Sequence, residues 1–291
     1  MRSHRRPVAS SASATRSHVV HWPTTLLVAL ALGACFAPDS LSFAGGSPNE
    51  HVHRRSQHLV RPAAAAGTEG SLRKLEVVYF TIPALAEPAR ILCALGELDW
   101  KDDRFSFAEW APRKAEAKWG QVPLLKVGGK QIANSKAIAR YLAKLVKVEG
   151  KPMYPEDPLE AALVDDVVDF FSDVHAKMGK TMSLPKEEKG AARQAALGEG
   201  GEVSKMLAML EANVDAFAVG DSMTLADIFV FWYLNFLNCG FWDGVTDRAD
   251  LISKPYPKLT AISEKVKAVP KIKEYYTKIA ANEPMYKCFA A

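Results

Sequence analysis

Histidine and cysteine are scarce in this chain after its first 70 residues, and their scarcity excludes several kinds of catalytic site. Of the seven histidines in the 291-residue sequence, only His175 lies after residue 74. A single histidine does not support a His-rich zinc site, and it leaves one base for a Ser-His or Cys-His pair. The cysteines after residue 74, which are Cys93, Cys239 and Cys288, form no Cys-x-x-Cys motif. We therefore expect reduced, mostly buried thiols and no metal site.

Negative charge is missing from the beginning of the chain. Residues 1–38 contain no Asp or Glu. Residues 1–70 hold seven arginines against three acids, which accounts for the whole net charge of +4. The rest of the chain is neutral and has no concentrated basic patch of the kind that nucleic acids attract. We therefore expect no nucleic-acid partner.

Long apolar runs are also missing. The run at residues 26–37 has 12 residues. That is too short for a membrane-spanning helix of about 20 residues, but it fits a signal-peptide core of about 7 to 15. Small residues near Cys35 suit cleavage there, and the segment from Phe36 to Ala66 is basic and contains Ser and Ala, as transit peptides do. We interpret residues 1–73 as a targeting leader outside the fold.

The leader has three interpretations. A signal core followed by a transit-like segment that begins with Phe resembles the bipartite leaders that direct proteins to plastids with extra membranes. A secretory signal with a disordered spacer and an Arg-rich mitochondrial leader are the alternatives. In each case we expect a mature protein without a membrane span.

After residue 73 the hydrophobic pattern divides the chain into two parts. Residues 74–148 alternate between strands and helices in the order β-α-β-α-β-β-α. The predicted strands are residues 75–80, 100–105, 123–127 and 130–133. Residues 149–158 form a linker rich in Pro and charge, and residues 159–291 show only helical periodicity, interrupted near Gly198–Gly201. We predict an α/β domain followed by an all-helical domain.

Several short motifs lie at fixed places in this pattern. They are Tyr79-Phe80 at the end of the first strand, Trp110 with Lys114, the block Gly120-Gln121-Val122-Pro123, Asn134-Ser135 before a helix, and the helical-domain motifs Thr224–Asp227 and Tyr256–Leu259. Each is weak alone, but together they are specific in order and spacing. With these motifs, residues 74–285 resemble the cytosolic-type glutathione S-transferases of the alpha, mu, pi and sigma group, closest to the tyrosine-dependent sigma class.

The resemblance implies a thioredoxin-like glutathione-binding domain, then an all-helical domain. It also implies a homodimer that transfers glutathione, its co-substrate, to a small hydrophobic electrophile in detoxification. A free thiol with a pKa of about 8.5 is only about 3% thiolate at pH 7, so it must be activated. We assign this catalytic role to Tyr79, as a phenol that donates a hydrogen bond to the sulfur. A tyrosine that only packs in the strand is the alternative.

Further residues are implied to bind the tripeptide. Val122 would pair its backbone with the cysteinyl unit beside a cis Pro123, whereas a trans proline at a strand start is the plainer reading. Ser135 would bind the γ-glutamyl carboxylate at a helix N-terminus, a place where it also serves as an N-cap. The implied glutathione-binding residues are Tyr79, Trp110, Lys114, Gln121, Val122, Pro123, Asn134, Ser135 and Asp173.

The two ends of glutathione are assigned to the remaining members of this set. Trp110 and Lys114, neighbours on one helical turn, would hold the glycyl end, although a surface lysine is usually only solvated. Asp173 would reach across the dimer interface toward the γ-glutamyl amine, and Asp169 is the fallback for this role. Both belong to an acidic stripe at helical spacing, which otherwise indicates a solvated face.

Two residues depart from the family pattern. Leu85 stands where the family usually has arginine, so thiolate stabilisation would rest on Tyr79 and backbone dipoles, and Asn134 replaces the usual glutamine. A non-catalytic ligand-binding or scaffold protein therefore remains an alternative, as does a glutathione-dependent isomerase or peroxidase of the sigma type. The electrophile pocket is expected between the domains. Its predicted lining is Phe170, Phe171, Val174, His175 and Met178.

Overall fold

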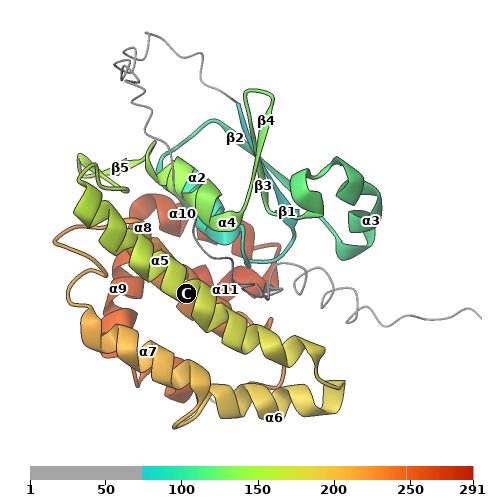
Figure 1. Ribbon diagram of the computed structural model, residues 1–291, viewed down its shortest axis with the longest axis vertical. Helices are drawn as coiled ribbons and strands as arrows, with labels where there is room; N and C mark the ends of the chain where they lie inside the picture. The colour runs from blue at the N-terminus through green and yellow to red at the C-terminus, as the bar shows by residue number, and fades with distance from the viewer. Residues whose placement is uncertain (1–73, 247, 291) are drawn as a thin grey trace, which may run out of the picture.

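The computed structural model of the protein describes residues 74–246 and 248–290, so the predictions for the leader lie outside the described residues. Figure 1 shows a small sheet domain beside a larger set of helices. The first domain contains β1 (Leu75–Phe80), α2 (Glu87–Leu95), β2 (Trp100–Phe105), α3 (Trp110–Arg113), β3 (Leu124–Val127), β4 (Lys130–Ala133) and α4 (Ser135–Ala143). The remaining elements are β5 (Lys147–Val148), β6 (Lys151–Pro152), α5 (Pro158–Gly179), α6 (Lys186–Leu197), α7 (Glu202–Asn213), α8 (Leu225–Asn238), α9 (Pro257–Ala268), α10 (Pro270–Ala280) and α11 (Lys287–Ala290).

The four main strands form one mixed sheet in the order β2-β1-β3-β4. β1 runs parallel to β2 and antiparallel to β3, and β3 pairs with β4 across Gly128 and Gly129. Both glycines have positive φ angles, which glycine adopts without a steric penalty. The predicted order of strands and helices is confirmed, with the third strand one residue shorter than expected.

Helices α2 and α4 lie between the sheet and the helical domain (Figure 1). Each is amphipathic and buries its apolar side completely, through Ile91 and Leu92 on α2 and Ile138 and Leu142 on α4. Full burial of one such side chain stabilises the fold by about 1.5–3 kcal/mol. The segments that begin these two helices therefore face the second domain.

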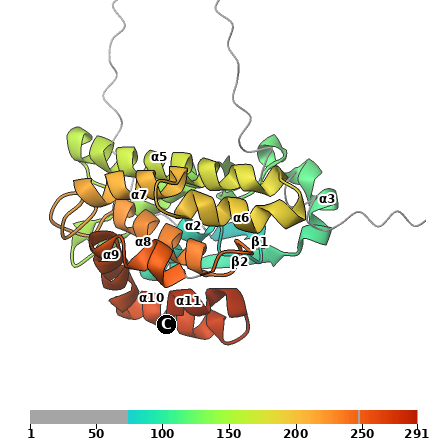
Figure 2. The same ribbon diagram turned by 90° about the horizontal axis from the view of Figure 1, so that it is seen from below.

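Helix α8 is the centre of the helical domain. All its residues from Leu225 to Leu237 are buried, and Figure 2 shows it between a layer of α5, α6 and α7 and a layer of α9, α10 and α11. A helix that is apolar on every side is stable only when other elements surround it. Asp227 fixes its first turn by accepting hydrogen bonds from the backbone N–H groups of Thr224 (2.7 Å) and Ala218 (2.8 Å). The predicted capping motif at Thr224–Asp227 is confirmed.

The predicted interruption in the helical pattern separates α6 from α7, and Gly200 has a φ of +72° in this connection. Within residues 74–246 and 248–290, no helix combines the length and apolar character needed to cross a bilayer. The predicted fold class is confirmed: an α/β domain with a mixed sheet precedes an all-helical domain.

Candidate active site

A cavity of about 180 Å³ lies where the sheet domain meets α5 and α8. Its polar end is lined by Gln121, Val122, Pro123, Asn134, Ser135 and Lys136. Its apolar end is lined by Leu85, Pro88, Phe171, Phe229 and Trp232, together with Ser172 and His175. Five of the residues predicted to bind glutathione are thus brought together on one wall.

The backbone at Val122 is open to a ligand. The Val122–Pro123 peptide bond is cis, which decides between the two readings of this proline. The N–H and C=O groups of Val122 form no hydrogen bond with another backbone group of the described residues. An extended peptide pairs with such an unpaired backbone edge as an added strand does.

Helix α4 points its N-terminus at the same cavity. Asn134 is the N-cap, because its side-chain Oδ1 accepts hydrogen bonds from the backbone N–H groups of Lys136 and Ala137, both at 3.2 Å. The structure thus gives Asn134 the capping role that the sequence suggested for Ser135. Asn134 has a φ of +144°, a conformation that residues other than glycine seldom adopt and that occurs preferentially at functional sites. Ser135 is the first residue of the helix and lines the cavity.

The two candidate aspartates differ in their surroundings. Asp169 forms ion pairs with Lys136 (2.7 Å) and Arg140 (3.0 Å) of its own chain. Partial burial works against ionisation, but these cations hold the pKa of Asp169 below its usual range. Asp173 is exposed and forms no ion pair within the described part of the chain. Of the two, Asp173 is the carboxylate without a charged partner among the described residues.

Besides Asp173, three of the residues predicted to bind glutathione do not line the cavity. Tyr79 is 1% exposed, its ring lies edge-on to the ring of Phe80 (centroids 5.2 Å apart), and the Arg90 guanidinium is 5.8 Å from its centroid. Trp110 lines a separate hollow of about 100 Å³ that shares Val122 with the cavity. Lys114 is exposed, and its alkyl chain lies over Gly120.

Only part of the predicted electrophile pocket reaches the cavity. Phe171 and His175 line it, whereas Val174 and Met178 are 0% exposed and belong to the helical core. Phe170 lines a groove of about 540 Å³ between α5 and α7. Successive residues of a helix point about 100° apart, so α5 presents Phe170 and Phe171 to different faces.

The apolar end also contains residues that the sequence did not single out. These are Pro88, Ser172, Phe229 and Trp232, with Lys136 at the polar end. The indole N–H of Trp232 donates a hydrogen bond to the carbonyl oxygen of Pro83 (3.2 Å), which ties α8 to the loop after β1. Because α8 is apolar on every side, its sequence gave no sign of which face meets a cavity.

Comparisons with known proteins agree with this geometry. Residues 75–144 match the family model described as glutathione S-transferase, N-terminal domain, and residues 172–278 match that of the glutathione S-transferase, C-terminal domain. The chain is 31% identical over 215 residues to hematopoietic prostaglandin D synthase of Gallus gallus, covering 70% of this chain and 95% of that protein. It is 30% identical over 210 residues to glutathione S-transferase S1 of Drosophila melanogaster, covering 70% and 78%.

The chain belongs to the glutathione S-transferase family. Its fold is also similar to that of prostaglandin synthase D of Nilaparvata lugens, with a TM-score of 0.62, 25% identity and coverage of 70% of this chain and 98% of that one. The transferase uses glutathione as its co-substrate. Within the residues that the structure describes, no group of three or more His, Cys, Asp or Glu could hold a metal ion.

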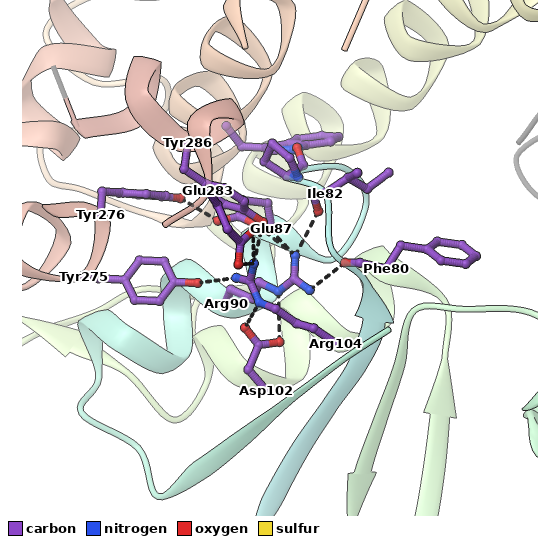
Figure 3. A network of polar contacts seen from close by, with 12 residues as sticks. Phe80, Ile82, Glu87, Arg90, Asp102, Arg104, Tyr275, Tyr276, Glu283 and Tyr286 are labelled. Atoms are coloured by element: carbon purple, nitrogen blue, oxygen red, sulfur yellow. Dashed lines mark hydrogen bonds and ion pairs between the residues drawn. The ribbon is translucent and has the colours of Figure 1, made fainter. Parts of the chain in front are cut away.

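A buried polar network fixes the loop between β1 and α2 of the transferase (Figure 3). The guanidinium of Arg90, 0% exposed, donates to the carbonyl oxygens of Phe80 (3.0 Å) and Ile82 (2.9 Å). It also donates to the carboxylates of Glu87 (3.2 Å) and Asp102 (3.1 Å). Burial raises the pKa of Glu87, and the charge of Arg90 opposes that rise.

The C-terminal segment completes this network. The Tyr286 hydroxyl lies 3.1 Å from Arg90, 3.2 Å from Glu87 and 3.2 Å from Arg104. Arg104 in turn forms an ion pair with Glu283 at 2.9 Å. The last elements of the chain therefore hold the same loop that lines the apolar end of the cavity.

Replacing Arg90 should destabilise the protein far more than replacing an exposed arginine. Arg90→Met leaves Glu87 without its buried partner, and removal of one member of a buried pair costs about 3–5 kcal/mol. Arg113→Met is the matched control, because Arg113 is paired with Asp103 at 2.9 Å but its side chain is 36% exposed. We expect the control to lose less than about 1 kcal/mol. Urea unfolding measures both, and equal losses would contradict the central place of Arg90.

Proposed function

We propose that the transferase binds glutathione along Val122 and the N-terminus of α4, ionises its thiol, and adds the sulfur to a small hydrophobic electrophile. The observation that carries this proposal is the cavity itself, in which an open backbone edge and a helix N-terminus meet an apolar compartment. Asn134 occupies the N–H groups of Lys136 and Ala137, so the γ-glutamyl carboxylate would be attracted by the Ser135 N–H group and the positive end of the α4 dipole. The apolar end then receives the electrophile.

Trp110 and Lys114 would hold the glycyl carboxylate. Trp110 lines the hollow that meets the cavity at Val122, so a tripeptide that binds at the α4 N-terminus and pairs with Val122 would extend toward it. Lys114 is exposed beside Gly120, from which its ammonium can reach a carboxylate. The opposite end of the tripeptide would meet Asp173 of a second subunit.

Tyr79 would activate the thiol, as in the tyrosine-dependent sigma class. It is the last but one residue of β1, and Arg90 holds the carbonyl oxygen of the next residue, Phe80. A phenol that donates to sulfur stabilises the thiolate, and a decrease of about 2 units in the thiol pKa corresponds to about 2.7 kcal/mol. Leu85 lines the cavity where the family usually has arginine, so no cation assists from this position.

Two alternatives have specific support. The burial of Tyr79 and the apolar side chain of Leu85 favour a ligand-binding or scaffold protein that keeps the fold without turnover. The likeness to proteins named prostaglandin D synthase supports a glutathione-dependent isomerase. In an isomerase the same thiolate would attack and later leave, so both catalytic readings require Tyr79.

A homodimer would form through the exposed face of α5. Leu159 (69% exposed) and Leu163 (49% exposed) are four residues apart on this helix, and Asp173 is exposed further along it. Leu163 also lines the groove between α5 and α7, next to Met209, which is 59% exposed. Trp119 is 73% exposed on the sheet domain, and a large exposed aromatic ring of this kind commonly marks an interface.

The leader, residues 1–73, would direct the protein to a plastid by the bipartite route, with residues 74–148 and 159–291 as the two domains of the mature enzyme. The support is compositional: an acid-free, Arg-containing start, a 12-residue apolar run and a basic segment after it.

Loss of the Tyr79 hydroxyl should remove activity rather than glutathione binding. We expect Tyr79→Phe to lower kcat/KM toward a generic aromatic halide by about 10² to 10⁴, while the affinity for glutathione stays nearly unchanged. Leu85→Arg should raise activity, because a cation near a thiolate lowers the pKa of the thiol. The readout is the thiolate absorbance of bound glutathione against pH. If wild type and Tyr79→Phe titrate at the same pH, the non-catalytic alternative is preferred.

A charge placed on the exposed face of α5 should disrupt the dimer. Leu163→Glu is expected to shift the protein to monomers and to weaken glutathione binding, because it separates Asp173 from the other subunit's cavity. Leu145→Glu is the control, since Leu145 is also 49% exposed but lies at the end of α4. Sedimentation velocity measures the state of both variants. A Leu163→Glu variant that behaves like the wild type would rule out this interface.

The leader should be dispensable for the fold. Deleting residues 1–70 is expected to leave the thermal transition and glutathione binding unchanged, because the leader has no acids before Asp39 and shares no amphipathic register with the two domains. A fluorescent fusion of residues 1–74 should enter the secretory route and then the plastid. A diffuse cytosolic signal would refute the location, and an insoluble truncated protein would refute the dispensability.

A further inference from the structure

The last residues of the chain reach the buried polar network through one phenol. Tyr286 ends a short 3₁₀ turn, Pro284–Tyr286, and is 0% exposed. It is 196 positions after Arg90, and the match to the C-terminal domain of the family ends before it, at residue 278. The contacts of Tyr286 therefore belong to a part of the chain that lies outside both family matches.

The hydroxyl of Tyr286 joins three charged side chains. It accepts hydrogen bonds from the guanidinium groups of Arg90 (3.1 Å) and Arg104 (3.2 Å), and it donates to Oε2 of Glu87 (3.2 Å). A phenol both donates and accepts, so one hydroxyl links two buried cations to a buried anion. Because Arg90 and Glu87 are themselves 3.2 Å apart, the hydroxyl closes a triangle with this ion pair (Figure 3).

Arg90 connects this triangle to the end of β1. Its guanidinium donates to the carbonyl oxygens of Phe80 (3.0 Å) and Ile82 (2.9 Å). The same group lies over the ring of Tyr79, 5.8 Å from the ring centroid, a distance at which a cation attracts an aromatic face. Arg90 therefore acts on both the side chain of Tyr79 and the backbone that follows it.

Loss of the Tyr286 hydroxyl would disturb Arg90. Among the described residues, Oε2 of Glu87 has two partners, the Tyr286 hydroxyl and Nη1 of Arg90, and this nitrogen also donates to Ile82. A buried carboxylate oxygen that loses one donor depends more strongly on the donor that remains. Arg90 would therefore be drawn toward Glu87 and away from Ile82, and Tyr79 would lose a fixed neighbour.

The ring of Tyr286 is held independently of its hydroxyl. Its centroid lies 6.3 Å from that of Tyr276 and 5.9 Å from that of Phe289. Phe289, 0% exposed, also packs on Phe231 of α8 at 5.7 Å. Phenylalanine at position 286 should thus keep the C-terminal segment in place and change only the polar contacts.

We propose that the Tyr286 hydroxyl is a positioning group for the transfer reaction: through Arg90 it fixes the Tyr79 phenol where that phenol meets the sulfur of glutathione. Tyr286 does not line the cavity, so it acts only through its neighbours. The inference rests on the proposed function, in which Tyr79 stabilises the thiolate, and adds the group that holds Tyr79 in place. Residues 283–290 thereby promote the ionisation of a thiol that they do not touch.

Three variants of the full chain, each replacing one tyrosine with phenylalanine, test this role. Tyr286→Phe removes the contacts of its hydroxyl with Arg90 and Glu87. Tyr276→Phe is the matched control, because Tyr276 is also 0% exposed and its hydroxyl donates to Glu87 at 2.9 Å. Tyr275→Phe removes a hydroxyl that accepts from Arg104 at 3.3 Å.

The readout is the pH at which the thiol of bound glutathione ionises, followed by the thiolate absorbance. This midpoint does not depend on how much of a variant is folded. We expect Tyr286→Phe to raise the midpoint by about 1 pH unit and to lower kcat/KM for chlorodinitrobenzene about tenfold at lower pH. Tyr276→Phe and Tyr275→Phe should leave the midpoint near that of the wild type, even where they lower stability in urea as much as Tyr286→Phe does.

Combination with Tyr79→Phe shows whether the effect passes through Tyr79. A group that acts only by placing the Tyr79 phenol has no effect once the phenol is absent. Tyr286→Phe should therefore not move the midpoint further in the Tyr79→Phe background. A further shift of the same size would overturn the inference, because Tyr286 would then act on the sulfur by another route.

The other outcomes separate this inference from the proposed function. A midpoint that moves in Tyr79→Phe but not in Tyr286→Phe would overturn the inference and leave the proposed function intact. Equal shifts in Tyr286→Phe and Tyr276→Phe would assign the effect to Glu87 and also overturn it. No shift in Tyr79→Phe would overturn the proposed role of Tyr79, and this inference with it.

Glu283→Gln decides the question if Tyr286→Phe does not fold. Glu283 holds Arg104 in an ion pair at 2.9 Å, and its side chain is 31% exposed, so the variant should fold. Because Arg104 donates to the Tyr286 hydroxyl, we expect a smaller rise of the midpoint in the same direction. A midpoint equal to that of the wild type would then overturn the inference.

Discussion

The site depends on the buried guanidinium of Arg90. β1 ends at Phe80, and beyond it the chain can no longer satisfy its carbonyl groups by strand pairing. Buried carbonyl oxygens need a donor, and Arg90 supplies one to both Phe80 and Ile82. The position of Tyr79, one residue before Phe80, is thereby set by a side chain on α2. The backbone around the proposed catalytic phenol is fixed by a charge that never meets solvent.

A buried charge of this kind requires a complete set of partners, and the helical domain supplies the last of them. Glu87 accepts hydrogen bonds from Tyr276 (2.9 Å) and Tyr286 (3.2 Å) in addition to its contact with Arg90. Desolvation of two charges is expensive, and their attraction offsets this cost only when additional hydrogen bonds satisfy the remaining polar atoms. Because both tyrosines come from the C-terminal helices, the network joins the two domains. The two walls of the cavity are held together by the same contacts that fix the loop.

Much of the fold could be predicted because its signals are local. The alternation of strands and helices in residues 74–148 follows from the hydrophobic period, and the capping motif at Thr224 follows from two side chains three residues apart. The network around Arg90 could not be predicted in this way. Its partner Tyr286 is 196 positions along the chain, and nothing in the local pattern of either residue indicates the other.

The lining of the cavity was predictable only in part, for a related reason. The residues at the polar end occupy loop and helix-start positions, where their roles follow from backbone geometry at Val122 and Asn134. The apolar end is made by helices that are covered on several sides. On α5 the periodicity does not separate Phe171, which reaches the cavity, from Val174, which is buried in the core. The packing of α5 against its neighbouring helices decides which of its apolar side chains reach the cavity. The hydrophobic pattern of a single helix carries no information about that packing.

The account's central claim is that the strand-end phenol of Tyr79 meets the sulfur of glutathione bound along Val122. A crystal structure of residues 71–291 with glutathione tests this claim most directly. We expect the sulfur within about 3.5 Å of the Tyr79 hydroxyl oxygen, near the range of a hydrogen bond to sulfur, and the cysteinyl backbone paired with Val122. A tripeptide bound in the same cavity with its sulfur more than about 5 Å from that oxygen would contradict the claim, because no hydrogen bond spans that distance.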